Sequence, residues 1–298
     1  MPFQYVARLA IFGTVLLASQ IPAQEPVDCR ARASNPSPTS PTVSDATDTA
    51  SCGVLVVESS WERQWPGDAA RDDSLGALFR FGIRPNLELR WASDGAMFAE
   101  DGQGSASGIG DTYVGVKYRI REQSPHFPSL ALRYTLKIPT ASPEKGLGSG
   151  FADHEIGVLL SRDFRPLHLD FTALQDFSGT EPGNGFEHTT WLALSATRNL
   201  GRRASVYGES YGVLPLENDN VAGAGAIAGL SYRLNSRLVV FSAVDFALTD
   251  NLPRKRLLVS LSYAVGNLYS FFKPSAAQLA RKSTIPAVSP ESGHNSVQ

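Results

Sequence analysis

Hydrophobic and polar residues alternate along most of this chain, in runs of roughly ten residues between positions 53 and 266. In the run DTYVGVKYRI, Val114 and Val116 share one face, and Lys117 and Arg119 share the other. A period of two is the side-chain alternation of a β-strand, and one face here suits lipid while the other suits water. A shift by one residue would turn Lys117 and Arg119 toward lipid, at about 2–4 kcal/mol each near the bilayer midplane. The pattern therefore predicts membrane-spanning strands with a strongly determined facing.

The alternation recurs often enough to predict an all-β fold, a transmembrane antiparallel β-barrel of about twelve strands and of the outer-membrane type. The predicted strands lie near residues 53–64, 74–84, 86–92, 110–121, 128–139, 153–163, 167–177, 187–198, 203–213, 223–234, 236–248 and 255–265. An even number is typical of bacterial barrels formed by one chain. Strands of soluble proteins average about 5–6 residues, so the length of these runs disfavours the alternative of a soluble β-sandwich.

Short and long connections alternate between the predicted strands. The short ones fall near Pro85, Pro166 and Asn235. The long ones are rich in Gly, Ser, Asp, Asn and Pro, and they cover residues 93–109, 140–152, 178–186 and 214–222. Outer-membrane barrels have short periplasmic turns and longer extracellular loops, so this asymmetry predicts the orientation of the barrel. With an even number of strands, both chain ends are expected on the periplasmic side.

The N-terminus has the features of a secretory signal peptide. Arg8 precedes an apolar run at residues 9–18, and Ala23 supplies a small residue before a cleavage point. The run is too short for a membrane-spanning helix, which needs about 20 residues. Beyond it, Pro, Ser, Thr and Asp predominate without periodicity, which is typical of disorder. The predicted domains are a signal peptide at 1–23, a disordered periplasmic leader at 24–51, the transmembrane β-barrel at 52–266 and a largely disordered C-terminal tail at 267–298.

Cys29 and Cys52, the two cysteines of the chain, bracket the predicted leader. In an oxidising periplasm they could form a disulfide that ties the leader to the start of the first strand. The alternative is two unpaired thiols, because sequence alone does not show that the two Cα atoms approach each other. No His or Cys lies at ligand spacing from either residue, so no metal site is predicted.

Composition narrows the possible functions. A formal net charge of −2 leaves no polybasic surface for a nucleic acid, and the charged fraction of 19% is below the usual ~25%. A barrel phospholipase needs a Ser, a His and an orienting Asn close together, and none of the five histidines shows that local pattern. His168 and Asp170 share a strand face, which we interpret as a structural hydrogen bond. No enzyme activity, cofactor or metal is predicted.

Four segments carry a family resemblance: Gly108–Asp111, Gly115–Arg119, Leu136–Thr140 and Gly146–Gly150. Together they resemble the bacterial outer-membrane family of meta-pathway phenol-degradation proteins, whose members are often called transporters. The resemblance extends over roughly residues 51–265, and it implies an outer-membrane barrel that passes small hydrophobic or aromatic compounds. Such barrels normally end on an aromatic residue of the last strand, which the barrel-assembly machinery recognises. This chain departs from that pattern because it continues well past Tyr263.

Alternation predicts that many charged side chains face the lumen. The candidate pore-lining residues are Glu58, Glu62, Arg80, Glu88, Arg90, Asp111, Lys117, Arg119, Arg133, Lys137, Glu155, Asp170, Glu209 and Asp245. Their mixed signs favour a narrow passage with opposed charges over an ion filter of one sign. Arg121 is expected to join the cations on this inner face. For each residue, the alternative is a network that satisfies buried charges and closes the barrel.

Two functional hypotheses follow. The first is passive passage of small, hydrophobic or aromatic solutes across the bacterial outer membrane. The second is a non-transporting structural or adhesive barrel with a plugged lumen. A bore of about twelve strands lies between the filled lumen of eight strands and the open channel of sixteen, so partial obstruction is expected. The predicted partners are the lipid bilayer, small hydrophobic solutes and, during biogenesis, the barrel-assembly machinery.

Overall fold

The structure is a computed structural model that describes residues 42–66, 70–101, 104–181, 185–215, 222–250, 252–253 and 255–270, together with Cys29, Pro36 and Thr39. The predicted signal peptide and the tail beyond residue 270 lie outside the described residues. Within this part of the chain, no helix has the length and apolar character needed to cross a membrane.

Thirteen strands are described. They are β1 (Val54–Trp65), β2 (Arg71–Arg84), β3 (Leu87–Glu100), β4 (Ser105–Ile109), β5 (Thr112–Arg121), β6 (Ser129–Ile138), β7 (Asp153–Phe164), β8 (Leu167–Gly179), β9 (Phe186–Asn199), β10 (Ala204–Pro215), β11 (Gly223–Arg233), β12 (Leu238–Ala247) and β13 (Lys255–Asn267). Two short 3₁₀ helices, η2 (Pro143–Lys145) and η3 (Leu268–Ser270), complete the described elements.

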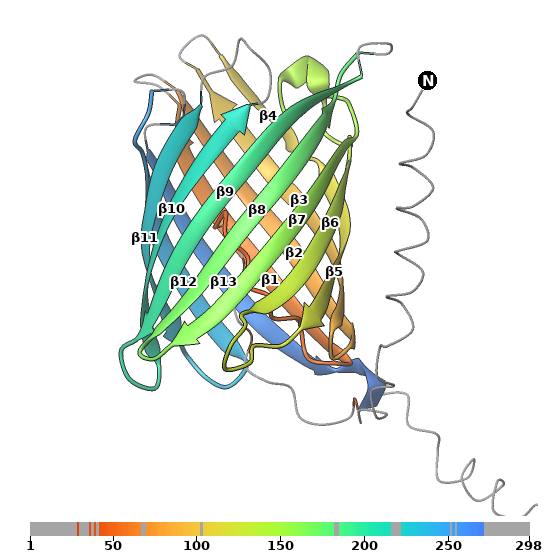
Figure 1. Ribbon diagram of the computed structural model, residues 1–298. Coiled ribbons are helices and arrows are strands. Elements are labelled where there is room, and N and C mark those ends of the chain that lie inside the picture. Colours follow the sequence, from red (N-terminus) through yellow and green to blue (C-terminus); the bar gives the residue numbers. More distant parts are fainter. Residues whose placement is uncertain are drawn as a thin grey trace, which may run out of the picture.

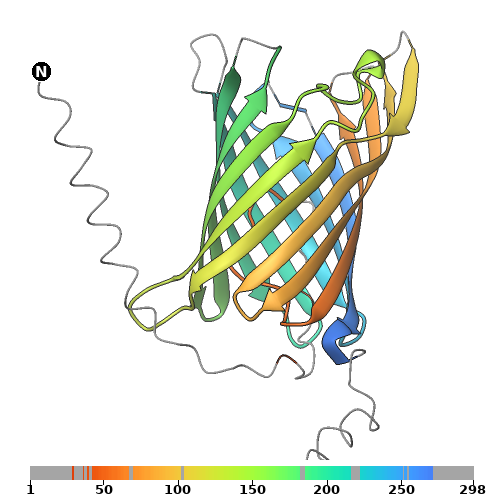
Figure 2. The same ribbon diagram turned by 90° about the vertical axis from the view of Figure 1, so that its right-hand side faces the viewer.

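The strands close into a barrel, as the sequence predicts. Each strand pairs with its neighbours in antiparallel fashion, β13 returns to β1, and β2 also pairs with β3. β4 and β5 pair with successive halves of β3, so the two share one place in the wall. The thirteen described strands therefore make a closed barrel of twelve positions. Figures 1 and 2 show the tilted wall, with the short turns at one end, the short-turn end, and the longer connections at the other, the loop end.

One predicted loop is in fact largely a β-hairpin. The segment 93–109 was expected to be an extracellular loop, but β3 continues to Glu100 and β4 pairs back along it, from Ala96 opposite Ile109 to Glu100 opposite Ser105. The Gly and Ser content suggested a loop, yet the backbone amides of such residues pair as well as any others. The break between β4 and β5 falls at Gly110, where a Cβ atom would come within 2.5 Å of the Asp94 side chain.

Burial follows the predicted alternation. On the outside, large side chains such as Trp91, Tyr118 and Ile156 are exposed and supply the apolar surface that a bilayer requires. On the inside, Lys117 and Glu88 are completely buried. The barrel interior is therefore filled largely by side chains and by a segment of the chain itself.

That segment is the end of the leader, which was predicted to be disordered. Residues 42–50, here called the lumenal strap, lie inside the barrel (Figure 1). Ser44, Asp45 and Thr47 are buried there. The prediction was wrong for these residues because their polar groups bond to the inward side chains of distant strands, and local composition does not reveal such partners. The earlier part of the leader lies almost entirely outside the described residues.

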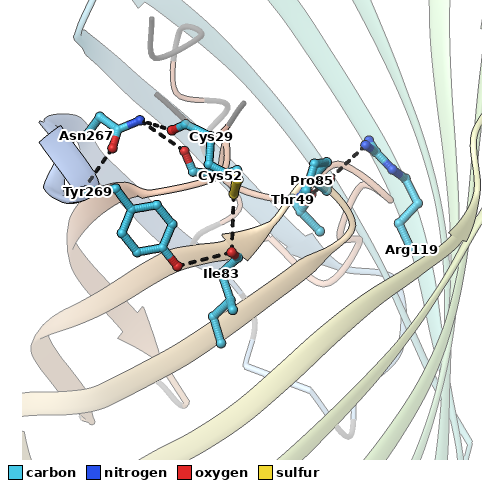
Figure 3. Close-up of a disulfide and its surroundings, with 8 residues drawn as sticks. All are labelled: Cys29, Thr49, Cys52, Ile83, Pro85, Arg119, Asn267 and Tyr269. Atoms are coloured by element: carbon cyan, nitrogen blue, oxygen red, sulfur yellow. Dashed lines mark hydrogen bonds between the residues drawn. A yellow bond between two sulfur atoms is a disulfide. The ribbon is translucent and has the colours of Figure 1, made fainter. Parts of the chain in front are cut away.

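Cys29 and Cys52 form a disulfide with a Cα–Cα distance of 4.9 Å, which decides the alternative that the sequence left open. The Asn267 side chain donates hydrogen bonds to the carbonyl oxygens of Cys29 and Cys52 (Figure 3). Tyr269 donates its hydroxyl hydrogen to Ile83 O at 3.1 Å. The first residues of the predicted disordered tail are thus ordered, because they close the short-turn end around the disulfide.

Candidate functional site

The lumenal strap is bound to four strands through its backbone amides. These N–H groups donate hydrogen bonds to inward side chains: Ser44 to Glu209 (3.0 Å), Asp45 to Thr172 (2.9 Å), Thr47 to Ser161 (2.9 Å) and Ala50 to Glu88 (2.6 Å). The acceptors lie on β10, β8, β7 and β3, which are spread around the barrel wall. The strap therefore crosses the lumen and is held from several sides.

Asp45 is the centre of this arrangement. Its carboxylate accepts from Lys117 Nζ at 2.7 Å and from Arg133 Nη1 at 2.8 Å, and it forms a third ion pair with Arg90. These cations come from β5, β6 and β3. Burial alone would raise the pKa of this carboxyl, but Arg90, Lys117 and Arg133 hold the pKa of Asp45 well below its usual range. One carboxylate from the strap thus offsets part of a concentrated patch of positive charge, in which Glu155 and Glu88 are further partners of Arg133 and Arg90.

Lys117 is fully committed to the strap. Besides Asp45, its ammonium group donates to the carbonyl oxygens of Ala46 at 2.8 Å and Asp48 at 3.2 Å. An ammonium group can donate three hydrogen bonds, so this buried cation is satisfied. Breaking such a contact without replacement leaves a buried charge uncompensated, which is costly.

A second buried cluster lies beside the strap on β1, β2 and β3. Arg80 bridges Glu58 and Glu88, with nitrogen–oxygen distances of 3.0 Å to each. All three side chains are almost completely buried. Glu58 also accepts from the Thr39 amide at 3.0 Å, so this cluster too contacts the leader.

The other predicted lumen residues lie in ion pairs or hydrogen bonds along the inner wall. Arg133 binds Glu155 at 2.7 Å, Lys137 pairs with Asp153 and approaches Asp111 at 3.7 Å, Arg256 pairs with Glu62 at 3.2 Å and with Asp245, Arg119 contacts Asp48 at 3.2 Å, and Asp170 accepts from Ser161 at 2.6 Å. The structure thus brings the predicted charges together inside the barrel.

Arg121 is an exception to the predicted facing. The register of β5 against β6 shifts between Arg119 and Arg121, so that Arg121 lies opposite Leu130. Leu130 belongs to the outward face that also carries the exposed Leu132. A β-bulge adds one residue to a strand and reverses the facing beyond it, so alternation alone placed Arg121 incorrectly.

The inner wall formed by β9 to β13, which does not carry the cations bound to Asp45, is largely apolar. Tyr211, Ile227, Phe241 and Leu258, from β10 to β13, form a buried cluster with Ala193 and Ala243, and Trp191 packs against it. The Trp191 and Tyr211 rings stack with centroids 6.3 Å apart. Val43 of the strap also packs on this cluster, so the strap contacts both sides of the lumen.

Two cavities lie on either side of the Asp45 layer. The cavity toward the short-turn end has a volume of about 340 Å³, and Ser44, Asp48, Tyr207 and Phe241 are among its lining residues. The cavity toward the loop end measures about 320 Å³, and its lining includes Arg90 and Arg133. Ser44 and Asp48 of the strap line the first cavity, and Arg90 and Arg133 of the second cavity bind Asp45, so the strap contacts the walls of both spaces.

The His168 site does not have the geometry of a Ser–His–Asp triad. His168 contacts Asp163 at 2.7 Å and Asp170 at 3.1 Å, and Ser161 donates its hydroxyl hydrogen to Asp170 rather than to the imidazole. A serine nucleophile needs the imidazole as its base, and here the serine is bound to the carboxylate instead. No cluster of three or more His, Cys, Asp or Glu residues suited to a metal occurs among the described residues.

Comparison with known protein families gives a match over residues 53–252, which is more than half of the chain, to the family described as "Putative MetA-pathway of phenol degradation". The chain belongs to this family. The match covers β1 to β12, so it agrees with the resemblance detected in the sequence. None of the curated proteins matches the chain.

Solved structures with a similar fold include an outer membrane channel from Pseudomonas putida F1, with 11% identity and a TM-score of 0.60 over 75% of this chain and 100% of that one. The NanC porin matches with 11% identity and a TM-score of 0.50, over 70% of this chain and 98% of that one. At such identities the likeness is one of fold. It is the fold of outer-membrane barrels, and the apolar exterior fits that location.

Three of the four family-like segments, those at residues 108–111, 136–140 and 146–150, meet at the loop end of the barrel. Asp111, at the break between β4 and β5, accepts a hydrogen bond from the Ala141 amide at 2.9 Å. A Cβ atom on Gly148 would lie 2.9 Å from the same carboxylate, so glycine allows the connection between β6 and β7 to pack closely there. These segments therefore anchor a loop against the barrel rim.

Sequence reasoning missed Asp45 and Arg256. Asp45 lies in a segment without periodicity, and no local signal distinguishes it from the other polar residues of the leader. Arg256 could have been found, because it shares the inward face of β13 with Leu258 and Ser260.

Proposed function

We propose that this protein is an outer-membrane channel for small solutes, and that the lumenal strap closes its lumen at rest. The observation that supports this most directly is the pair of cavities, about 340 and 320 Å³, that the Asp45 layer separates. Both volumes are near the lower end of the range of small-molecule sites, about 300–1,000 Å³. Displacement of the strap would join them into one path.

The solute class that we propose is small and hydrophobic or aromatic. Tyr207 and Phe241 line the cavity at the short-turn end, and Trp191 and Tyr211 continue this aromatic surface on the same side of the lumen. Aromatic rings pack favourably against one another in stacked and edge-on arrangements. The description of the family, which refers to phenol degradation, agrees with such a solute.

Opening would depend on Asp45. In the closed state its carboxylate pairs with Arg90, Lys117 and Arg133 and offsets part of their charge. Once the strap leaves, these cations face the lumen without that partner, and low-dielectric walls strengthen their field. The open channel should therefore favour anions. The Cys29–Cys52 disulfide would keep the displaced strap near the short-turn end, so that it can return.

A second candidate function is a closed barrel that transports nothing and has a structural or adhesive role. The observation that favours it is the number of contacts that hold the strap, with partners on β3, β5, β6, β7, β8 and β10. Such a network could serve to fill the lumen permanently.

Conductance in planar bilayers separates the two functions. We expect the parent protein to give rare openings and Asp45→Ala to give frequent, anion-selective ones. The matched control is Asp48→Ala, which removes a carboxylate three positions further along the strap. The Asp48 side chain is 66% exposed and pairs with Arg119, so this change should leave the parent behaviour intact. Silence from the parent and from both variants, with the barrel folded, would favour the closed barrel.

The solute class needs its own measurement. Proteoliposomes that contain Asp45→Ala should take up benzoate faster than gluconate, an anion without an aromatic ring. Equal rates would leave the channel function standing and would refute the aromatic preference. Substitution of Phe241 by Ala should reduce the benzoate rate specifically, because it removes a ring from the proposed path.

A further inference from the structure

The outer surface near the short-turn end carries a cluster of arginines and exposed apolar residues. We call it the basic rim and define it as Arg121, Phe127, Arg162, Phe164, Leu167 and Arg198. The strand register makes it continuous, since Phe164 lies opposite Leu167 and Leu167 lies opposite Arg198. The turn between β5 and β6 joins it, because Arg162 donates a hydrogen bond to Pro125 O at 2.8 Å.

The apolar members of the basic rim face outward. The exposed fractions of Phe127, Phe164 and Leu167 are 56%, 52% and 40%. They extend the outer apolar surface, represented nearby by the exposed Phe171 and Leu194 of β8 and β9. The basic rim is therefore the border of the lipid-facing surface and not an isolated patch.

The arginines of the basic rim keep their charge available. Arg121 lies over the Phe127 ring at 4.9 Å from its centroid, and Arg162 lies over the Phe164 ring at 5.1 Å. Within the described residues, neither of them nor Arg198 forms an ion pair. The nearest carboxylates in sequence, Glu122 and Asp163, are engaged with Arg119 and His168.

We propose that the basic rim binds the phosphate headgroup of an anionic phospholipid in the leaflet at the short-turn end. A guanidinium group matches a phosphate with paired N–H donors, and it stacks on aromatic rings at the same time. Aromatic side chains at the membrane interface hold the barrel at the depth of the headgroups. The positive charge, the interfacial rings and the continuity with the apolar belt all indicate this one partner. The lumen plays no part in it, so the proposal is independent of channel activity.

The test is lipid retention by the folded barrel. Parent protein in mixed micelles is offered phosphatidylglycerol and phosphatidylcholine in equal amounts, and the bound lipids are quantified by native mass spectrometry. We expect phosphatidylglycerol to be retained preferentially, and less so at high salt. Equal retention of the two lipids by the parent protein would overturn the proposal.

The decisive variant is the triple substitution Arg121→Gln, Arg162→Gln and Arg198→Gln. We expect it to lose about tenfold or more of its phosphatidylglycerol retention, because each cation near an anionic surface contributes. The matched control removes three cations at the loop end, Arg63→Gln, Arg71→Gln and Lys255→Gln. Arg63 and Lys255 also lie over aromatic rings, those of Trp61 and Trp65, so the control removes ring-stacked cations at the opposite end of the barrel. Arg63 and Arg71 differ from the rim arginines in that both pair with Asp73.

The control should retain phosphatidylglycerol as the parent does. Equal loss in both triple variants would mean general charge attraction and would refute a specific surface. The band shift between unheated and boiled samples identifies the folded fraction, and retention is compared within that fraction. If the triple variant folds poorly, Arg198→Gln alone should still lower retention by a measurable amount, and unchanged retention would contradict the proposal.

Discussion

The two sides of the lumen differ in what holds them together. On β1 to β8 the inner face is dense in charge, and Glu58, Arg80, Glu88 and Lys117 are buried there in ion pairs or hydrogen bonds. From β9 to β13 the inner face consists mainly of apolar and small residues, with Tyr211, Ile227, Phe241 and Leu258 in one buried cluster. The first wall is held mainly by ion pairs and the second mainly by packing, with Glu209 and the Asp245–Arg256 pair as its charged groups.

This difference indicates which wall fixes the position of the lumenal strap and so closes the lumen. Charged partners require a particular geometry, so the charged side fixes the lumenal strap at Asp45. Apolar packing is less directional, and on the apolar side the strap is held by the packing of Val43 on the buried cluster. Glu209 adds hydrogen bonds from the Val43 and Ser44 amides. A solute that passes along the apolar side would meet few charged side chains that require a hydrogen-bonding partner.

The largest expected effect comes from the charged side. Arg80→Leu removes the cation that bridges the buried carboxylates of Glu58 and Glu88, and breaking such a cluster costs about 3–5 kcal/mol. Urea unfolding in lipid vesicles, followed by tryptophan fluorescence, measures the loss. Arg63→Gln, which breaks the more exposed pair with Asp73, is the control and should have little effect. Similar losses of unfolding free energy in both variants would mean that the buried cluster contributes no more to stability than an exposed ion pair.

The next effect concerns the lumenal strap. Asp45→Asn weakens three charged contacts, and a hydrogen bond to a charged group is worth about 1.5–3 kcal/mol, so bilayer openings should rise about tenfold or more. Glu209→Gln, on the apolar side, keeps one of the two oxygens that accept from the Val43 and Ser44 amides, and it should raise openings less. The reverse order would show that the apolar side holds the strap.

A smaller effect should follow from trimming the apolar side. Ile227→Val removes one buried methylene and should lower the free energy of unfolding by about 0.5–1.5 kcal/mol. Val43 of the strap packs on the same cluster, but the ion pairs of Asp45 are unchanged by this substitution, so the conductance should match that of the parent. A stability loss together with frequent openings would mean that packing on this side also closes the lumen.

The smallest effect is expected from acid. The pKa of Asp45 is depressed in the folded protein, so its contribution is present above the unfolded pKa and is lost as the pH falls through the lower folded value. The normal pKa of Asp is about 3.9, so Asp45 stays charged at pH 5. Openings of the parent between pH 8 and pH 5 should therefore not report release of Asp45, and Asp45→Asn should remain more active at both pH values.

The sequence by itself determined the barrel, its facing and the charges inside it. Alternation in runs such as DTYVGVKYRI separates lipid-facing Val116 from buried Lys117, because a side-chain period of two allows no other distribution across one wall. The same alternation accounts for Trp191, which shares the inward face of β9 with buried Ala193 and stacks on Tyr211 inside the barrel. Long and short connections followed from composition, except where the 93–109 segment formed a hairpin.

Tertiary structure alone decided what occupies the lumen. Asp45 bonds to residues 45, 72 and 88 positions away in sequence, and no local pattern encodes such partners. The β-bulge at Arg119 and Arg121 turned one predicted lumen cation outward, since bulges arise from pairing with the neighbouring strand. The disulfide likewise required the approach of Cys29 to Cys52, which closure of the barrel around Asn267 provides. Side-chain periodicity is a local property of the backbone, whereas a buried charge finds its partner only when distant strands have closed around it.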